Sequence, residues 1–241
     1  MNKIFKFIRR LLSFFIFDKK LRHLFVDGLY KQCEIYINYK LHNNKKFDYN
    51  LSVVLIIKNA AQYMDEWICY HKIVGVDHFY IYDNESEDNL KEVLKPYIKK
   101  GVVTYTYWPG KKQQVTVYDH ALNKYRNETK WMAFIDDDEF MVPVAGNTIP
   151  EVLSSLELQN GITMPWIMYG TSGHKKETKD FVISRFRKHG TDITNYKSII
   201  NPRLCEKLDV HAGIFINGFC YEENKLMKKM PIKALKAIKI L

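Results

Sequence analysis

The sequence predicts an α/β domain with a mostly parallel central sheet, helices on both faces of that sheet, and mixed strands in the C-terminal half. Three observations support this prediction. Between residues 51 and 142, apolar runs rich in β-branched side chains alternate with segments of helical periodicity. The loops between them are short, which is typical of βαβ units. The first run, LSVVLIIKN, is continuously apolar, as expected of a strand buried on both faces.

Seven elements follow one another in the order βαβαβαβ. The second predicted helix has a start signal, because Ser86 with Asp88 or Asn89 nearby resembles a capping box, and it stops at Gly101. The crossovers between parallel strands are expected to be right-handed. The predicted strands cover 51–59, 76–84, 102–108 and 130–142, and the predicted helices cover 60–75, 86–101 and 113–127.

The second half of the chain predicts a short helix followed by strands of mixed direction. The helix covers 146–156, and the strands cover 161–170, 181–187, 197–202 and 213–217. We therefore divide the chain into an N-terminal helical arm at 1–47, an α/β domain at 48–220 and a basic C-terminal tail at 221–241.

The chain is basic, and this charge favours anionic partners. It has 37 Lys and Arg against 27 Asp and Glu, a formal net charge of +10. Phosphorylated substrates, nucleic acid or an anionic membrane surface fit this balance, and so does a merely soluble basic protein. The four cysteines are widely spaced without a CxxC pair. This spacing disfavours a zinc site or a disulfide framework and favours a reducing compartment.

The N-terminal segment, MNKIFKFIRRLLSFFIFDKK, predicts a basic amphipathic helix. Lys6, Arg9 and Arg10 interrupt its apolar run, so it falls short of the ~20 apolar residues of a membrane span. Such a helix could lie on an anionic membrane surface, or it could pack its apolar face on the protein's own core. Both cases need the same periodicity, and the sequence leaves them open.

Four carboxylates directly follow the last predicted strand of the first half, in the stretch WMAFIDDDEF. If the strand continues, Asp136 and Asp138 point to one side, and Asp137 and Glu139 point to the other. Like charges at such a strand end repel one another, and a divalent cation removes that cost. Mg²⁺ and Mn²⁺ prefer carboxylate and phosphate oxygens, so the spacing predicts a metal–phosphate platform. The alternative is a solvated acidic turn.

Polar side chains also follow the other predicted parallel strands. Lys58 and Asn59 end the first of these strands, and Asp83 and Asn84 end the second. Ligands of open α/β sheets bind at the carboxyl ends of the strands, so these residues are expected to border a ligand site, where Asp83 and Asn84 can hydrogen-bond a base or ribose. The alternative for Asp83 and Asn84 is ordinary turn and capping chemistry.

Five stretches in this order resemble the family 92 glycosyltransferases and their family 2-like bacterial relatives. They are LSVVLIIKNAAQYMDEWICYHKIVGVDHFYIYDNESEDN, QQVTVYDHAL, KWMAFIDDDEF, KSIINP and VHAG. The resemblance covers roughly residues 51 to 213. It implies a fold of the GT-A type, a nucleotide-sugar donor, a divalent metal (Mn²⁺ or Mg²⁺) and inversion at the anomeric carbon.

The resemblance also implies roles for individual residues. Lys197 is expected to neutralise the diphosphate, with a plain surface lysine as the alternative, and a structural histidine is the alternative for His211. The nucleotide-sugar residues implied are Lys58, Asn59, Asp83, Asn84, Asp136 and Lys197, and the metal ligands implied are Asp136, Asp138 and His211.

An inverting displacement needs a general base for the acceptor hydroxyl, and the sequence does not single one out. The candidates lie in the second half, where the acceptor is expected, close to the glycine-containing polar loop 169–176. They are Glu177, Asp180, Asp192 and His174.

The sequence therefore predicts a metal-dependent inverting glycosyltransferase that moves a sugar from a nucleoside-diphosphate sugar to a glycan hydroxyl. The resemblance favours galactose and a UDP-sugar. The Lys, Asn and Ile richness favours a bacterial cytoplasmic enzyme, peripheral on the inner membrane, that acts on lipid-linked glycans of capsule or lipopolysaccharide. One alternative is a nucleotidyltransferase, although KNAAQY lacks its glycine-rich phosphate loop. Another is a non-catalytic basic module that binds membrane or nucleic acid, although no nucleic-acid partner is expected.

Overall fold

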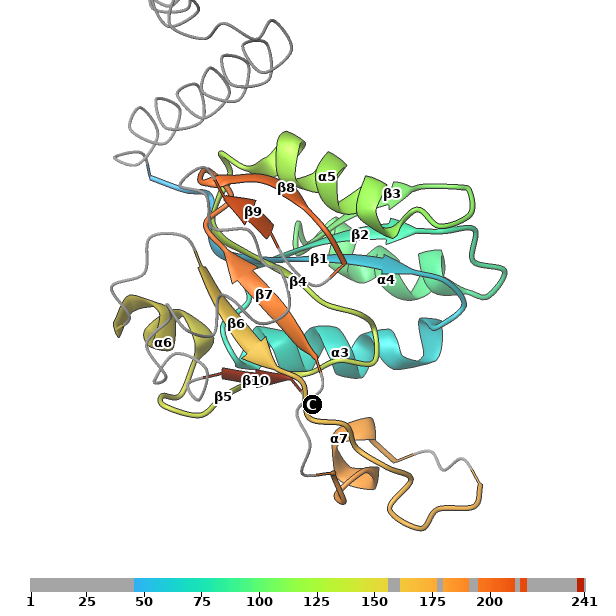
Figure 1. Cartoon of the computed structure of the whole chain (residues 1–241). Coiled ribbons are helices and arrows are strands. Elements are labelled where there is room, and N and C mark those ends of the chain that lie inside the picture. The colour runs from blue at the N-terminus through green and yellow to red at the C-terminus, as the bar shows by residue number, and fades with distance from the viewer. Residues whose placement is uncertain are drawn as a thin grey trace, which may run out of the picture.

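A computed structural model describes residues 46–155, 161–176, 180–190, 195–210, 213–215 and 238–240. Nearly all of the predicted N-terminal arm and most of the predicted basic tail lie outside these residues. Within them, no helix combines the length and the apolar character that crossing a membrane requires. Figure 1 shows a central sheet with helices on both of its faces, as predicted.

The central sheet has six strands in the order β3-β2-β1-β4-β7-β6. The four strands of the first half pair in parallel, and β7 and β6 extend the sheet in antiparallel fashion. Parallel pairing in the first half and strands of mixed direction in the second confirm the predicted pattern. The strands are β1 Tyr49–Ile57, β2 His78–Asp83, β3 Val103–Tyr107, β4 Thr129–Phe134, β6 Gly161–Pro165 and β7 Tyr196–Ile200.

Helices cover both faces of this sheet and produce two cores. On one face, α3 Ala61–Ile73, α4 Leu90–Lys99 and α6 Ile149–Ser155 pack on alternate residues of β1 such as Val53. On the other face, α5 Gln114–Tyr125 packs on the intervening residues. Both faces of β1 are therefore buried, which is why its sequence is apolar without alternation.

Two short antiparallel pairs complete the described part of the domain. Strand β8 Cys205–Leu208 pairs with β9 Gly213–Phe215, and β5 Met141–Pro143 pairs with β10 Ile238–Ile240. The side chains of Ile238 and Ile240 are buried in the main core. The described end of the predicted tail is thus part of the packed domain.

The capping box predicted at Ser86 is wrong. Helix α4 begins at Leu90, whose N–H donates to Asp88 Oδ1 at 3.2 Å. The other oxygen of Asp88 accepts the N–H of Ala61 at 2.9 Å, at the start of α3. Ser86 Oγ instead accepts the N–H of Asn59 at 3.1 Å. The loops after β1 and β2 therefore satisfy each other's backbone donors.

The strand predicted at 181–187 is also wrong, because Val182–Arg185 forms a short helix, α7. Both carboxylate oxygens of Glu66 on α3 accept backbone N–H groups there, from Val182 at 2.8 Å and from Ile183 at 3.1 Å. A carboxylate at this position satisfies donors that the first helical turn leaves unpaired. A contact across 116 residues of sequence thus decides the local structure.

The order of the strands fixes where a ligand site is expected. In the central sheet, β2 and β3 lie on one side of β1. The next strand along the chain, β4, lies on the other side of β1. In open α/β sheets, ligands bind at such a reversal, outside the carboxyl ends of the strands. The residues that follow β1 and β4 therefore border the expected site.

Candidate functional site

The four carboxylates form a turn and not a strand end, because β4 stops at Phe134. The Glu139 N–H donates to the Asp136 carbonyl at 3.2 Å, and the Asp136 N–H donates to Glu139 Oε2 at 2.8 Å. We call residues 136–139 the acidic turn. The prediction that Asp136 and Asp138 point to one side of a strand, and Asp137 and Glu139 to the other, is wrong, because such alternation requires an extended chain.

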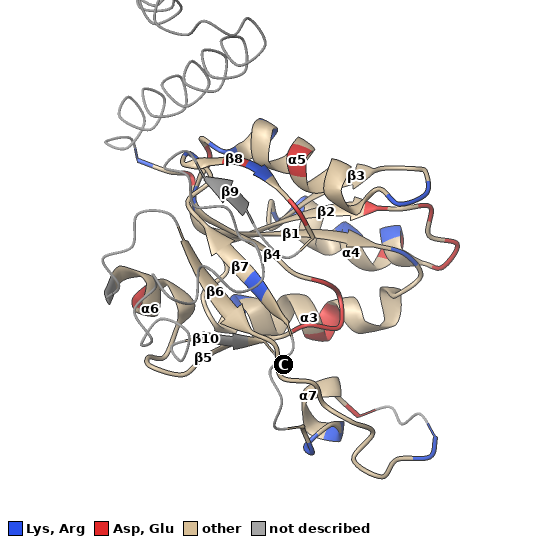
Figure 2. Cartoon of the chain, in the orientation of Figure 1, with Lys and Arg blue, Asp and Glu red and all other residues tan. Residues whose placement is uncertain are grey.

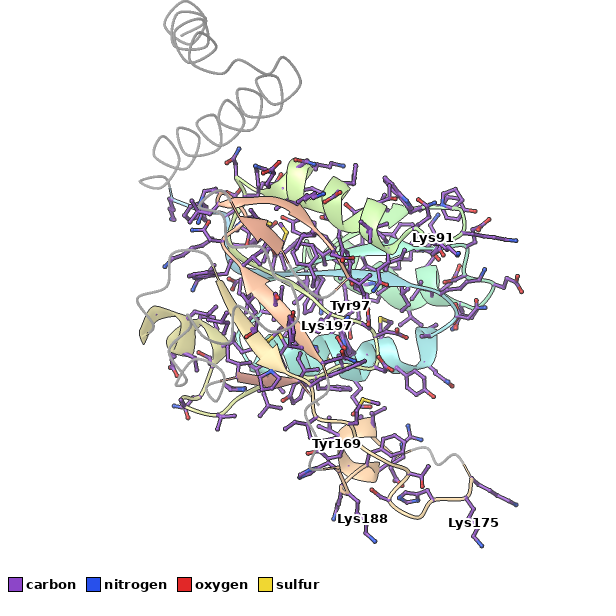
Figure 3. All side chains as sticks on the ribbon, viewed as in Figure 1. Lys91, Tyr97, Tyr169, Lys175, Lys188 and Lys197 are labelled. Atoms are coloured by element: carbon purple, nitrogen blue, oxygen red, sulfur yellow. The ribbon has the colours of Figure 1, made fainter. Side chains whose placement is uncertain are left out.

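Lys197 of β7 holds the two ends of the acidic turn together. Its ammonium lies 2.6 Å from Asp136 Oδ2 and 3.5 Å from Glu139 Oε2. The antiparallel register pairs Phe134 with Ser198, so Lys197 lies beside the point where β4 ends. Only 1% of the Lys197 side chain is exposed, and Figure 3 shows it inside the body of the domain. Lys197 is therefore no surface lysine.

Two residues of α5 fix the other oxygen of Asp136, and sequence reasoning missed both. Gln114 Nε2 donates to Asp136 Oδ1 at 2.9 Å and to the Tyr118 hydroxyl at 3.0 Å. Burial, reinforced by the charge of Asp136, raises the pKa of Tyr118, which keeps its hydroxyl protonated. The i, i+4 spacing of a Gln and a Tyr in QQVTVYDH was the available signal.

Glu139 is the buried member of the acidic turn, with 1% of its surface exposed. Burial raises its pKa to about 7, although the Lys197 ammonium acts in the opposite direction. Its Oε1 atom is buried without a hydrogen-bond partner in the described part of the chain. At neutral pH Glu139 thus carries only part of its formal charge, which reduces repulsion within the turn.

Helix α3 anchors the chain just after the acidic turn through three side chains. Trp67 Nε1 donates to the Glu139 carbonyl at 2.9 Å, and the Tyr70 hydroxyl donates to the Met141 carbonyl at 3.2 Å. His71 Nε2 accepts the Met141 N–H at 3.2 Å, while its Nδ1 donates to the Trp67 carbonyl at 2.8 Å. These bonds require neutral His71, and complete burial lowers its pKa to about 3.

We expect His71 to make the protein sensitive to acid. The unfolded state takes up the proton first, near pH 6.5, so stability present above that pH is lost as pH falls toward 3. Between pH 7.5 and 5.5, wild type should lose about 1.4 kcal/mol more unfolding free energy than His71→Gln. Urea unfolding of both proteins with EDTA present measures this difference. Equal losses would contradict the assigned tautomer.

The polar residues at the ends of β1 and β2 lie together at the carboxyl edge. Asp83 is buried, and its two oxygens accept the Ser86 N–H at 2.8 Å and the Tyr105 hydroxyl at 2.6 Å. Asn84 donates to the carbonyls of Trp108 and Gly110 at 2.8 and 2.9 Å. Turn chemistry thus accounts for the placement of both residues, and their contact with a nucleoside stays a prediction.

Asn59 has a left-handed backbone conformation, with φ of 57°. Its side-chain oxygen accepts the Glu87 N–H at 2.7 Å, which ties the end of β1 to the loop after β2. Lys58 beside it is exposed. An asparagine tolerates this conformation better than most residues, so the tight exit from β1 is explained locally.

A cavity of about 490 Å³ opens on the α3 side of the acidic turn. Asp137 and Asp138 line one part of it, and basic side chains from residues 174–185 line another. Burial raises the pKa of Asp137, so this carboxylate is a stronger base than an exposed one. His174 also lines the cavity, whereas Asp180 is exposed outside the lining. Glu177 and Asp192 lie outside the described residues.

The donor set fits a divalent cation only in part. Among the described residues, no group of three or more His, Cys, Asp or Glu side chains is arranged to hold a metal, and His211 is not described. Asp136 is occupied by Lys197, Gln114 and Tyr118, whereas Asp138 is exposed. Mg²⁺ is usually held by one or two carboxylates plus substrate phosphates, and Asp138 suits that arrangement.

Comparison with known proteins identifies the family. The model of glycosyltransferase family 92 matches residues 54–238, which is most of the chain. The chain belongs to glycosyltransferase family 92. Family membership, together with the sheet order and the antiparallel strands beyond β4, makes this fold the GT-A type, so the predicted family and fold class are confirmed.

The curated relatives of this family 92 chain include plant proteins. A family 92 protein of Oryza sativa is 30% identical over 68% of the chain and 29% of its own length. The galactan beta-1,4-galactosyltransferase GALS2 of Arabidopsis thaliana is 33% identical over 75% of the chain and 39% of its own length. The chain thus spans between about three tenths and two fifths of the length of these relatives.

Among solved structures, residues 1–349 of S. aureus TarS show a likeness with a TM-score of 0.41. The sequence identity is 15%, and the match covers 54% of this chain and 38% of that one.

Proposed function

We propose that this family 92 domain transfers a sugar from a nucleotide-sugar donor to a hydroxyl of a glycan acceptor. The observation that carries the proposal is the acidic turn. It lies where the strand order reverses, and β7, α5 and α3 hold it in one conformation. A rigid group of carboxylates at this place is what a metal-bound diphosphate requires.

The donor and acceptor are proposed more specifically as UDP-galactose and a galactose-containing glycan. The galactan beta-1,4-galactosyltransferase name of two Arabidopsis relatives supports galactose. The curated relatives compared above come from plants, and they support neither a bacterial source nor a capsule or lipopolysaccharide acceptor. A peripheral position on the cytoplasmic face of a membrane is also a prediction only, because the N-terminal segment lies outside the described residues.

In the proposed mechanism each residue of the acidic turn has a different task. Asp138 would hold Mn²⁺ or Mg²⁺ together with the donor phosphates, and such a cation stabilises the charge on the departing diphosphate. Asp136 is immobilised by three donors, two on Oδ1 and one on Oδ2, so Oδ2 can accept one more hydrogen bond, for example from a ribose hydroxyl. Lys197 is buried, so we assign it to neutralising the turn and not the diphosphate.

Inversion requires the acceptor hydroxyl to attack the anomeric carbon opposite the bond to the diphosphate. That glycosidic bond breaks as the new C–O bond forms, and the hydroxyl proton passes to a general base. Asp137 and His174 both line the cavity beside Asp138. They are therefore the two candidates for this base.

The two alternative functions have less support. Nucleotidyl transfer would use a glycine-rich phosphate loop after β1, and residues 58–63 read KNAAQY. A non-catalytic basic module would gather its Lys and Arg over one surface. In the described part of the chain these residues lie on several elements, and residues 166–190 carry only some of them (Figure 2).

A thermal-shift titration tests the proposed donor. UDP-galactose with Mn²⁺ is expected to raise the melting temperature by several degrees at ligand concentrations about 100-fold above the dissociation constant. UDP-galactose with EDTA should have a much smaller effect, because in this proposal Asp138 would bind the donor phosphates through the cation. GDP-mannose and CMP-sialic acid serve as matched nucleotide controls. No response to any nucleotide sugar with Mn²⁺ would overturn the proposal.

A further inference from the structure

Residues 166–190 form an excursion that leaves the edge of the sheet after β6 and carries α7 (Figure 1). Its two limbs are joined by hydrogen bonds from Gly170 N–H to the Lys188 carbonyl at 2.9 Å and from Gly190 N–H to the Met168 carbonyl at 3.0 Å. Glu66 of α3 holds the start of α7 through both carboxylate oxygens. In its described residues the excursion is therefore a folded unit fixed to α3.

The excursion is strongly basic. It contains six Lys and Arg against two Asp and Glu, a formal net charge of +4 within 25 residues of a chain whose total is +10. Figure 3 shows Lys175 and Lys188 projecting from it, away from the sheet. Both labelled lysines are exposed, so they do not contribute to the buried core of the central domain. This concentration of positive charge favours the binding of an anionic ligand.

The cavity beside the acidic turn has two chemically different sides. Asp137 and Asp138 contribute carboxylates from the turn, whereas His174, Lys175 and Lys176 contribute basic groups from the excursion. Arg185 of α7 also lines it and is 91% buried, so this guanidinium is part of the built wall and not a mobile surface group. A volume of about 490 Å³ lies in the range of sites for small ligands.

We propose that this cavity binds the acceptor and that the acceptor carries an anionic group, a carboxylate or a phosphate. Lys175 and Lys176 contact that group, and the reacting hydroxyl lies at the opposite side, beside Asp137 and Asp138. The proposal rests on the proposed glycosyl transfer and adds the chemical class of the acceptor. A neutral acceptor would offer no group of opposite charge to Lys175 and Lys176.

The donor diphosphate is a less suitable ligand for the same lysines. The reversal of strand order predicts the nucleotide at the ends of β1 and β4, where a cation held by Asp138 would balance its phosphates. The basic side chains come from the excursion, and α7 is attached to α3. The basic side chains thus belong to the excursion and not to the strand ends where the nucleotide is expected.

Calorimetric titration of three probes into the protein with UDP and Mn²⁺ tests this inference. The probes are neutral β-1,4-galactobiose, digalacturonate for a carboxylate, and galactose 6-phosphate for a phosphate. We expect at least one anionic probe to bind about five-fold or more tightly than galactobiose. Lys175→Gln/Lys176→Gln should remove most of that preference and change UDP affinity less than about two-fold. Tighter binding of digalacturonate would identify the anionic group as a carboxylate, and tighter binding of galactose 6-phosphate would identify it as a phosphate.

Lys99→Gln/Lys100→Gln is the charge-matched control. Both lysines are exposed at the end of α4, where the chain leads into the amino end of β3, and this variant should keep the preference. Equal affinity for neutral and anionic probes would overturn the inference. So would a loss of UDP affinity in Lys175→Gln/Lys176→Gln as large as the loss for the anionic probe. Failure of wild type to bind UDP would instead contradict the proposed function, and Lys175-dependent anion binding would then remain measurable without nucleotide.

Discussion

Asp138→Asn is expected to reduce sugar transfer roughly a hundredfold or more while the melting temperature stays within about 2 °C of wild type. An amide is a poor ligand for a hard cation, and its neutral charge removes the attraction that holds the cation beside the diphosphate. The side chain is exposed, so the fold does not depend on it. Transfer rates from UDP-galactose over a range of Mn²⁺ concentrations, together with thermal unfolding, measure both effects.

Glu92→Gln is the matched control, since it removes an exposed carboxylate from α4, outside the proposed site. This control should keep wild-type rates. High Mn²⁺ should restore part of the activity of Asp138→Asn if the variant only weakens cation binding. Full turnover of Asp138→Asn at low Mn²⁺ would show that Asp138 is not the ligand.

Lys197→Met is expected to lower the free energy of unfolding by about 3 kcal/mol at pH 8. It leaves Asp136 and Glu139 together at one place without the cation that balances them. Burial raises the pKa of Glu139 to about 7 even with Lys197 present, and the loss of Lys197 raises it further. A raised carboxyl pKa contributes stability at low pH that is lost as pH rises through it. The destabilisation should therefore be smaller at pH 5.5.

A double-mutant cycle with Glu139→Gln isolates this interaction. Lys197→Met/Glu139→Gln should be more stable at pH 8 than Lys197→Met, and its stability should depend less on pH. Urea unfolding of the four proteins at pH 8 and 5.5 provides the comparison. A loss that is equal at both pH values and unchanged by Glu139→Gln would show that charge balance is not the role of Lys197.

Local patterns were sufficient for the parallel half of the fold. The continuous apolar run of β1 and the helical periodicity of α3 to α5 predicted elements that the structure confirms. Each of these elements buries one face or both faces in a core. Burial of one face leaves a repeating pattern of apolar residues in the sequence, and burial of both faces leaves a continuous apolar run. The carboxyl edge followed from topology alone, because parallel strands bring their ends together.

The failures all involve contacts between residues far apart in the chain. The strand before the acidic turn stops at Phe134 while Trp67, Tyr70 and His71, about 70 residues earlier, bind the chain beyond it. Helix α7 depends on Glu66, 116 residues before it. Such hydrogen bonds leave no period in the sequence. The i, i+4 spacing of Gln114 and Tyr118 is visible in the sequence, but the contact of Gln114 with Asp136, 22 residues later, is not.

We expect a metal-bound nucleotide sugar to occupy the carboxyl edge between β1 and β4. Anomalous scattering from crystals soaked with UDP and Mn²⁺ tests it most directly. We predict one manganese peak within coordination distance of the Asp138 carboxylate, with the diphosphate on the same ion and the nucleoside toward Asp83 and Asn84. If manganese and UDP bind elsewhere, in crystals of protein that transfers sugar in solution, the carboxyl edge is not the donor site.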